Sequence, residues 1–143
     1  MQKIKGDIFN TDIQYIAQQC NCVTTYGRGL FTAIKNKYKW ADTYSTNKNR
    51  IPGTIDIKGN GKDKRFVINM YAQKNVGKHS FEKRIEWFKQ CLYQISQIDG
   101  ISEIAFPYKI GCGMGGGDWS VYRQMIKTFS DENPNIQVFI IKL

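Results

Sequence analysis

The chain has little of what metal-binding, secreted and membrane-spanning proteins need. Its 143 residues include a single histidine, His79, and four cysteines, at positions 20, 22, 91 and 112. One Cys-x-Cys pair without a second pair does not supply the four ligands of a structural zinc site, and the spacing does not resemble a disulfide framework. We therefore expect reduced, buried thiols, no bound metal and no cofactor.

Long apolar runs are missing as well. The longest, such as 138–141, are far too short to cross a bilayer. The first seven residues contain no apolar stretch of signal-peptide length. We expect a soluble, cytoplasmic protein without a membrane partner. The length is that of one ordinary domain, so we expect a single domain over residues 1–143. We also expect a monomer, and no internal repeat or low-complexity tract appears.

The chain does have apolar residues, aromatic residues and positive charge. Apolar residues make up 41% of the sequence, which is enough for a globular core. The formal net charge is +9, which favours anionic partners such as nucleotides, nucleic acid or phosphorylated metabolites. The basic cluster at 58–65 is interpreted as a solvated hairpin tip, since charge runs most often lie on exposed faces.

Apolar alternation and helical spacing predict an α/β protein. We expect strands at residues 1–9, 13–21, 54–58, 65–71, 102–107 and 136–143, with a hairpin turn at 59–63. We expect helices at 30–38, at 40–49, between Ser80 as N-cap and Asp99, and from Asp118 as N-cap to residue 132. The second-last of these should bury Phe81, Ile85, Phe88, Leu92 and Ile95. Helices between strands favour a three-layer α/β/α domain with a mixed sheet.

Two glycine-bearing loops lie where a strand is expected to pass into a helix. The first contains Gly27-x-Gly29, and the second runs from Gly111 to Gly117 before Asp118. Glycine lets backbone N–H groups approach an anion, and the start of a helix adds a positive dipole end. Since ligands of α/β sheets bind beyond the carboxyl ends of the strands, we expect both loops to meet in one cleft for a phosphate-bearing molecule.

The second loop formally matches a dinucleotide fingerprint, but its context does not. A Rossmann reading needs a further strand that ends in an acidic residue about 20 positions on. Here Asp131 and Glu132 lie at the end of an expected helix. A Walker loop needs Gly-Lys-Ser/Thr, which the sequence lacks.

Four motifs in order resemble a known family. They are Lys5-Gly6-Asp7-Ile8, Asn21 with Gly27-x-Gly29-Leu30, Asn69-Met70-Tyr71-Ala72-Gln73, and Ile110-Gly111-Cys112-Gly113 followed by Gly116-Gly117-Asp118-Trp119. Together they resemble a macro domain, and most closely the branch with ADP-ribose 1″-phosphate phosphatases and the terminal ADP-ribose glycohydrolase type. The resemblance spans nearly the whole chain and implies a sheet of about six strands between helices, with a cleft for ADP-ribose.

The resemblance also implies roles for individual residues. Asp7 would accept from the adenine amino group, with the Ile8 amide nearby; the alternative for Asp7 is a turn-capping role. Asn21 would lie by the distal ribose, with Tyr71 and Gln73 near the same end, although Tyr71 is equally interpretable as core. The two loops would hold the distal ribose and the diphosphate through Gly27, Arg28, Gly29 and Leu30 on one side and Gly111, Cys112, Gly113, Met114, Gly115 and Gly116 on the other.

Departures from the family pattern affect the expected chemistry. An Asn-Ala-Ala-Asn-like run is replaced by 18–21, Gln-Gln-Cys-Asn, and Arg28 replaces a middle glycine, which adds a charged phosphate contact. The glycohydrolase type has a lysine at the position where this chain has Ala72-Gln73. The aspartate that acts with that lysine is replaced by Gly115 in this chain. These differences argue against a lysine-adduct mechanism.

Asp118 is the remaining catalytic candidate. Its carboxylate would hold water at the distal ribose, and the alternative is a simple helix N-cap. Cys112 has no neighbouring base to activate it. We therefore predict an ADP-ribose 1″-phosphate phosphatase. The alternatives are a hydrolase that removes ADP-ribose from protein or nucleic acid, a reader that binds without turnover, and a basic nucleic-acid-binding module.

Overall fold

A mixed six-stranded sheet forms the centre of the molecule. The computed structural model describes residues 1–25, 27, 29–45, 49–59, 65–113 and 116–142. The strand order is β1-β6-β5-β2-β4-β3, and all neighbouring pairs are parallel except β3 with β4. The strands are β1 (Gln2–Lys5), β2 (Tyr15–Gln19), β3 (Ile55–Lys58), β4 (Phe66–Met70), β5 (Glu103–Pro107) and β6 (Gln137–Lys142).

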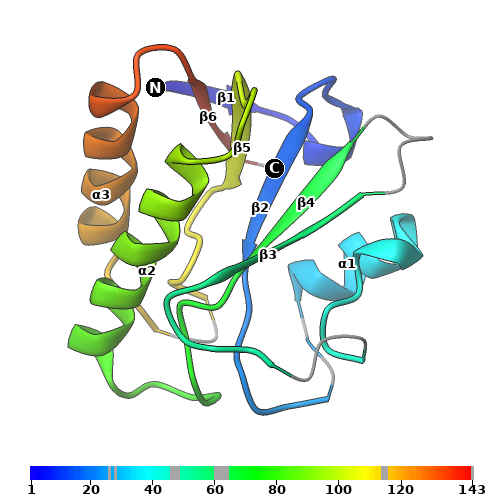
Figure 1. Cartoon of the computed structure of the whole chain (residues 1–143), viewed down its shortest axis with the longest axis vertical. Coiled ribbons are helices and arrows are strands. Elements are labelled where there is room, and N and C mark those ends of the chain that lie inside the picture. The colour runs from blue at the N-terminus through cyan, green and yellow to red at the C-terminus, as the bar shows by residue number, and fades with distance from the viewer. Residues whose placement is uncertain (26, 28, 46–48, 60–64, 114–115, 143) are drawn as a thin grey trace.

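Helices cover both faces of the sheet, which confirms the predicted three-layer α/β/α architecture. Figure 1 shows α2 (Phe81–Ser96) and α3 (Trp119–Glu132) together on one face and α1 (Leu30–Lys37) on the other. Two short 3₁₀ turns, η1 (Ile8–Asn10) and η2 (Lys39–Ala41), complete the described elements. No helix in the described part of the chain has the length and apolarity needed to cross a membrane.

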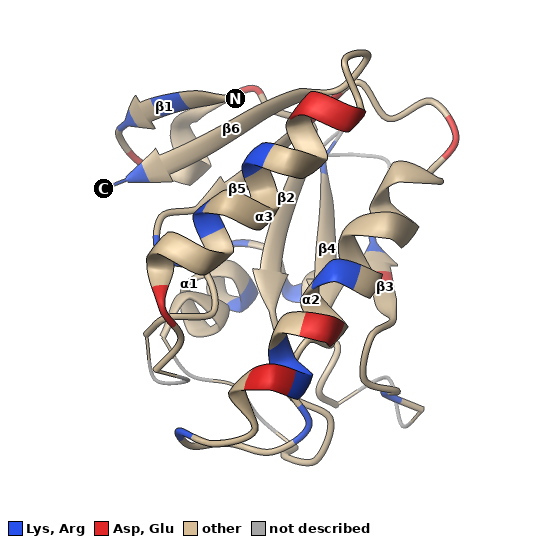
Figure 2. Cartoon of the chain, turned by 90° about the vertical axis from the view of Figure 1, so that its left-hand side faces the viewer, with Lys and Arg blue, Asp and Glu red and all other residues tan. Residues whose placement is uncertain are grey.

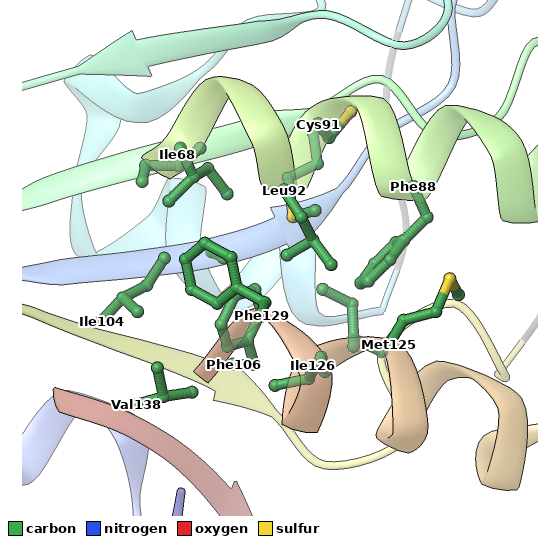
Figure 3. Packing of buried hydrophobic residues seen from close by; sticks show 14 of the residues in the cluster. Ile68, Phe88, Cys91, Leu92, Ile104, Phe106, Met125, Ile126, Phe129 and Val138 are labelled. Carbon is green, nitrogen blue, oxygen red and sulfur yellow. The ribbon is translucent and has the colours of Figure 1, made fainter. Parts of the chain in front are cut away.

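The larger core lies between the sheet and the α2–α3 pair. Phe88, Leu92 and Ile126 pack against strand residues such as Ile68 and Ile104, as Figure 3 shows. Phe88 and Leu92 lie one turn apart on α2, so one face of this helix enters the core and the opposite face is in contact with water. A second cluster around Ile16, Ile34 and Val67 joins the opposite face to α1.

The first strand and the second predicted helix are shorter than expected. β1 ends at Lys5 because Gly6 takes a φ of +151° and Asp7 then caps η1 by accepting from the Phe9 amide at 2.9 Å. The helix predicted over 40–49 is wrong, since only Lys39–Ala41 is helical among the residues described there. Asp42 accepts from the amides of Tyr44 and Ser45 and so forms a turn instead.

Two predicted details of α2 are also wrong. Ser80 precedes the helix, but its side chain makes no capping bond; its backbone is left-handed and its hydroxyl pairs with Nδ1 of His79. Phe81, the first residue of α2, is 44% exposed rather than buried. The β3–β4 pair is antiparallel, as a hairpin requires, and most of the predicted turn lies outside the described residues.

Candidate functional site

A cleft of about 580 Å³ opens at the carboxyl ends of β2, β4 and β5. Three loops lead from these strand ends: 20–29, which we call the first loop, 108–118, the second loop, and 71–80, the third loop. Gly27 and Gly29 line the cleft together with Gly111 and Gly113. The predicted convergence of the two glycine-bearing loops is therefore confirmed.

The first loop is fastened by Arg50 and Tyr44. Arg50 donates to the carbonyl oxygens of Asn21 and Thr24, at 3.1 and 2.6 Å, and its guanidinium lies 5.0 Å from the centre of the Tyr44 ring. The Tyr44 hydroxyl accepts from the backbone N–H of Asn21, and burial raises the pKa of this phenol above its usual value. Arg50 and Tyr44 thus fix the first part of this loop, at Asn21 and Thr24.

Asn21 itself is an organiser of this loop. Its side-chain oxygen accepts from the amides of Val23 and Thr24 and from the Thr24 hydroxyl, at 2.9 to 3.1 Å. Its side-chain nitrogen donates to Tyr44 at 3.4 Å. The side-chain oxygen of Asn21 is therefore occupied by the loop, although the residue lines the cleft.

The third loop is fastened from α2. Arg84 is only 1% exposed and donates to the carbonyl oxygens of Asn75 and Gly77, at 2.9 and 2.7 Å. Burial lowers the pKa of its guanidinium. Gln73 joins this loop to β2 by accepting from Nε2 of Gln19 at 3.1 Å.

Two unpaired oxygens lie in the wall of the cleft. Gln18 is 2% exposed and uses Nε2 to bond Asn69 on β4 at 2.7 Å, while its Oε1 is buried without a partner. Oε1 of Gln19 is also buried without a partner. Leaving such an acceptor unsatisfied costs about 1–3 kcal/mol, so each oxygen would gain from a donor. Neither oxygen has accessible surface in this structure, so the side chain must move before it can accept from a group in the cleft.

The structure brings together only part of the predicted site. The predicted residues that line the cleft are Asn21, Gly27, Gly29, Leu30, Gln73, Gly111 and Gly113. Those that do not line it are Asp7, Ile8, Tyr71, Cys112, Gly116 and Asp118. Arg28, Met114 and Gly115 lie outside the described residues. Contact of any of these residues with a ligand stays a prediction.

The predicted residues outside the cleft have structural surroundings of their own. Ile8 is buried in the cluster beneath α1, next to the cap formed by Asp7. Tyr71 is 1% exposed, packs with Phe31, and shares a short hydrogen bond with the hydroxyl of Thr43. These positions match the alternative readings of Asp7 as a turn cap and of Tyr71 as core.

Asp118 is exposed and caps α3. Its Oδ1 accepts from the backbone N–H and the hydroxyl of Ser120, at 3.0 and 2.8 Å. Burial, and then the charge of Asp118, raise the pKa of Cys112. The sequence-based N-cap is confirmed.

Several residues that line the cleft were missed by sequence reasoning. They are Gln18, Gln19, Thr24, Phe31, Tyr44, Val76, Gly77, Pro107, Tyr108, Lys109 and Ile110. Tyr44 gives no local signal, because it reaches Asn21 from 23 positions away. Gln18 and Gln19 did give one: polar residues at the end of an otherwise apolar strand.

The half-buried thiols are not activated. Burial, and for Cys112 also the charge of Asp118, raises the pKa of Cys22 and Cys112 to about 11. At neutral pH we expect each to react with iodoacetamide roughly a hundredfold more slowly than a free cysteine peptide, because the thiolate fraction falls tenfold per pKa unit. Mass spectrometry of briefly alkylated native protein checks this, and labelling of Cys112 at the rate of the peptide would contradict it.

The cleft offers acceptors and glycine-rich backbone rather than metal ligands. Among the described residues no group of histidine, cysteine and carboxylate side chains is placed to hold a metal ion. A larger groove, of about 840 Å³, runs between α2 and α3 and includes Leu92, Met125 and Phe129. It lies on the outer face of the helices and receives neither glycine-bearing loop.

Comparison with known proteins identifies the fold. No protein-family model matches the chain, and no curated protein sequence does. Among solved structures, a Bacteroides thetaiotaomicron protein of unknown function is 26% identical, with a TM-score of 0.81 over 99% of this chain and 97% of that one. The macrodomain of Mycobacterium tuberculosis DarG is 18% identical, with a TM-score of 0.78 over 98% and 97% of the two chains. Thermosipho africanus DarTG in complex with ADP-ribose is 20% identical, with a TM-score of 0.79 over 99% of this chain and 42% of that one. The chain has the fold of a macrodomain.

Proposed function

We propose that the cleft binds ADP-ribose. The observation that carries this proposal is a cleft at the carboxyl ends of the strands that is bordered by two glycine-bearing loops and lined by the amide residues Gln18, Gln19 and Gln73. Amide oxygens require donors, which ribose hydroxyls supply, and glycine-bearing loops let backbone N–H groups reach phosphates. A ligand that joins sugar hydroxyls to a diphosphate meets both requirements. The bound ADP-ribose of the Thermosipho africanus structure supports this choice.

Within this proposal the two loops enclose the diphosphate, and Arg28 adds a charge-assisted contact. Gln18 accepts from a ribose hydroxyl, because the side-chain oxygen of Asn21 is already occupied by its own loop. Asn21 then contributes by holding the loop in shape. Asp7 and Ile8 remain the proposed contacts for adenine.

Titration calorimetry with ADP-ribose tests the proposal, with Gln18→Leu as the informative variant. Loss of one hydrogen bond to a buried acceptor is expected to weaken ADP-ribose binding about tenfold. Gln137→Leu is the matched control, since Gln137 is exposed on β6 and lies outside the cleft. Absence of binding by the wild-type chain would exclude the function, whereas equal affinity of wild type and Gln18→Leu would exclude only the role of Gln18.

Hydrolysis of ADP-ribose 1″-phosphate is the second candidate function. It is favoured by Asp118, which ends the second loop and whose Oδ2 makes no hydrogen bond among the described residues. In this mechanism the Asp118 carboxylate takes a proton from a water that attacks phosphorus, the P–O bond to the distal ribose breaks, and the ribose oxygen takes up a proton and leaves as ADP-ribose. Loop amides and Arg28 stabilise the charge on the transferred phosphoryl group, which is released as inorganic phosphate. Removal of ADP-ribose from protein or nucleic acid is an alternative use of the same site, and a reader without turnover is another.

Replacement of Asp118 separates its capping role from a role in hydrolysis. Asparagine is a good N-cap but a poor proton acceptor, whereas alanine is neither. We expect Asp118→Ala to lower the free energy of unfolding by about 1 kcal/mol and Asp118→Asn by only a few tenths. Both should abolish phosphate release. Wild-type phosphate release by Asp118→Asn would rule out hydrolysis through this carboxylate, and binding without release by the wild-type chain would favour the reader.

A further inference from the structure

Three lysines converge on one aromatic ring beside the cleft. The ammonium groups of Lys142, Lys3 and Lys109 lie 4.7, 5.4 and 5.6 Å from the centre of the Tyr108 ring. Trp119 packs edge-on against the same ring, with 5.2 Å between ring centres. We call these five residues the Tyr108 cluster. Tyr108 and Lys109 also line the cleft, so the cluster and the cleft share a border.

Within the part of the chain that the structure describes, no acidic side chain forms an ion pair with a lysine of this cluster. The described residues form three ion pairs, through Lys35, Lys58 and Lys127, and none includes a lysine of the cluster. Asp118, next to Trp119 in sequence, directs its Oδ1 to Ser120 instead. A cation over an aromatic face gains a modest attraction, but three like charges at one ring repel one another. The arrangement therefore leaves a concentrated positive charge for an external anion.

The fold positions this charge at one corner of the sheet. β1 and β6 are parallel neighbours, with Lys3 opposite Ile140 and Lys5 opposite Lys142. Because side chains alternate along a strand, Lys3, Lys5 and Lys142 share the α3 side of the sheet, while Ile4 faces the opposite core. Figure 2 shows basic residues at the adjoining ends of β1 and β6. The backbone of Lys109 is left-handed, with a φ of +62°, a region that disfavours side chains with a Cβ.

We propose that the Tyr108 cluster binds the backbone of a single-stranded nucleic acid. Closely spaced ammonium groups suit successive phosphates, and the adjoining Tyr108 and Trp119 rings suit stacked bases. Both rings are partly exposed. Inorganic phosphate and acidic peptides match only the charge, whereas a nucleic acid strand matches the charge and the aromatic surface. The net charge of +9 brings such a strand to the protein. This surface is additional to the ADP-ribose cleft and does not depend on turnover there.

Fluorescence anisotropy with a labelled oligothymidine of about twelve nucleotides tests the proposal. The informative variant carries Lys3→Gln, Lys109→Gln and Lys142→Gln. The control carries Lys37→Gln, Lys83→Gln and Lys89→Gln, which removes the same number of exposed lysines from α1 and α2. At low salt we expect the cluster variant to bind at least about tenfold more weakly than wild type, and the control within about twofold. The slope of log affinity against log salt should fall by about 2 in the cluster variant.

Two further measurements separate nucleic acid from other anions. Tyr108→Leu should weaken oligothymidine binding severalfold without changing the salt slope, since stacking is lost and the charges remain. Polyglutamate of matched charge should compete poorly. Equal losses in the two lysine variants, equal competition by polyglutamate, or no salt-dependent binding by the wild-type chain would overturn the proposal. Because the assay contains no ADP-ribose, failure of ADP-ribose binding leaves its outcome unaffected.

Discussion

Replacing Arg65 with methionine is expected to lower the free energy of unfolding by about 3–4 kcal/mol. Arg65 precedes β4 and is 7% exposed. Its guanidinium donates to the carbonyl oxygens of Ile8, Phe9 and Ile13 and to the hydroxyls of Thr11 and Tyr38, over 2.7 to 3.3 Å. Methionine fills part of the volume but leaves these acceptors without a donor.

The loss is large because one side chain fixes a whole connection. The segment between β1 and β2 has few regular backbone bonds, and the planar guanidinium supplies donors in several directions at once. Lysine keeps the charge but lacks the planar set of guanidinium N–H donors, so Arg65→Lys should lower the free energy of unfolding by about 2 kcal/mol. Arg123→Met, at an exposed position of α3, should stay within about 0.5 kcal/mol of wild type.

Urea unfolding followed by circular dichroism measures these differences, and the melting temperature of Arg65→Met should fall by about 10 °C. Equal stabilities of Arg65→Met and Arg123→Met would contradict the account. The same connection carries Asp7 and Ile8. ADP-ribose binding by a destabilised Arg65 variant therefore also tests whether the predicted adenine contacts of Asp7 and Ile8 depend on Arg65.

The sequence predicts local structure here better than it predicts long-range contacts. Strand, glycine-bearing loop and helix follow one another at Gln19, Gly27 and Leu30, and each is specified by residues within a few positions. The same holds for Asp118, whose capping bond spans two residues. These local elements were predicted correctly because the residues that cause each of them lie within a few positions of it in the sequence.

The arginine anchors of the first loop and of the β1–β2 connection could not be predicted in this way. Arg50 reaches Asn21 across 29 positions, and Arg65 reaches Ile8 across 57. Their partners are backbone carbonyl oxygens, which any residue type supplies, so the sequence carries no matching partner to recognise. The basic cluster at 58–65 illustrates the error: Arg65 was grouped with a solvated hairpin tip but is buried.

The position of β6 is a second feature that local patterns do not contain. β6 is last in the chain but lies between β1 and β5, so the first and last strands pair. Apolar alternation identifies a strand but not its neighbour. This pairing brings Lys142 to Tyr108, and the Tyr108 cluster is consequently invisible in a sequence where its members lie at positions 3, 108, 109, 119 and 142.

Gly111→Ala is expected to give the largest loss of ligand binding in the second loop. Gly111 has a φ of +78°, and a Cβ there would lie 2.6 Å from Cε1 of Tyr122 and 3.0 Å from Oε1 of Gln19. Tyr122 is 2% exposed and packs edge-on against Phe88 in the core, so its ring cannot move aside cheaply. The loop must shift instead, away from the position in which it borders the cleft.

Gly100→Ala is the matched control for this substitution. Gly100 has a nearly identical φ of +76°, but a Cβ there meets nothing within 4 Å, and the residue lies outside the cleft. Left-handed alanine alone costs about 1 kcal/mol, and overpacking adds about 1–3 kcal/mol. We therefore expect the free energy of unfolding to fall by about 2–4 kcal/mol in Gly111→Ala and by about 1 kcal/mol in Gly100→Ala.

Binding distinguishes the two variants further. Displacement of the second loop should weaken ADP-ribose binding more than about tenfold in Gly111→Ala, whereas Gly100→Ala should bind within about twofold of wild type. Calorimetry at a temperature where both variants are folded compares them directly. If both glycine variants bound ADP-ribose as tightly as wild type, the second loop would not border the ligand. Weaker binding in Gly111→Ala alone would mean that the close approach of Gly111 to Tyr122 and Gln19 sets the shape of this wall.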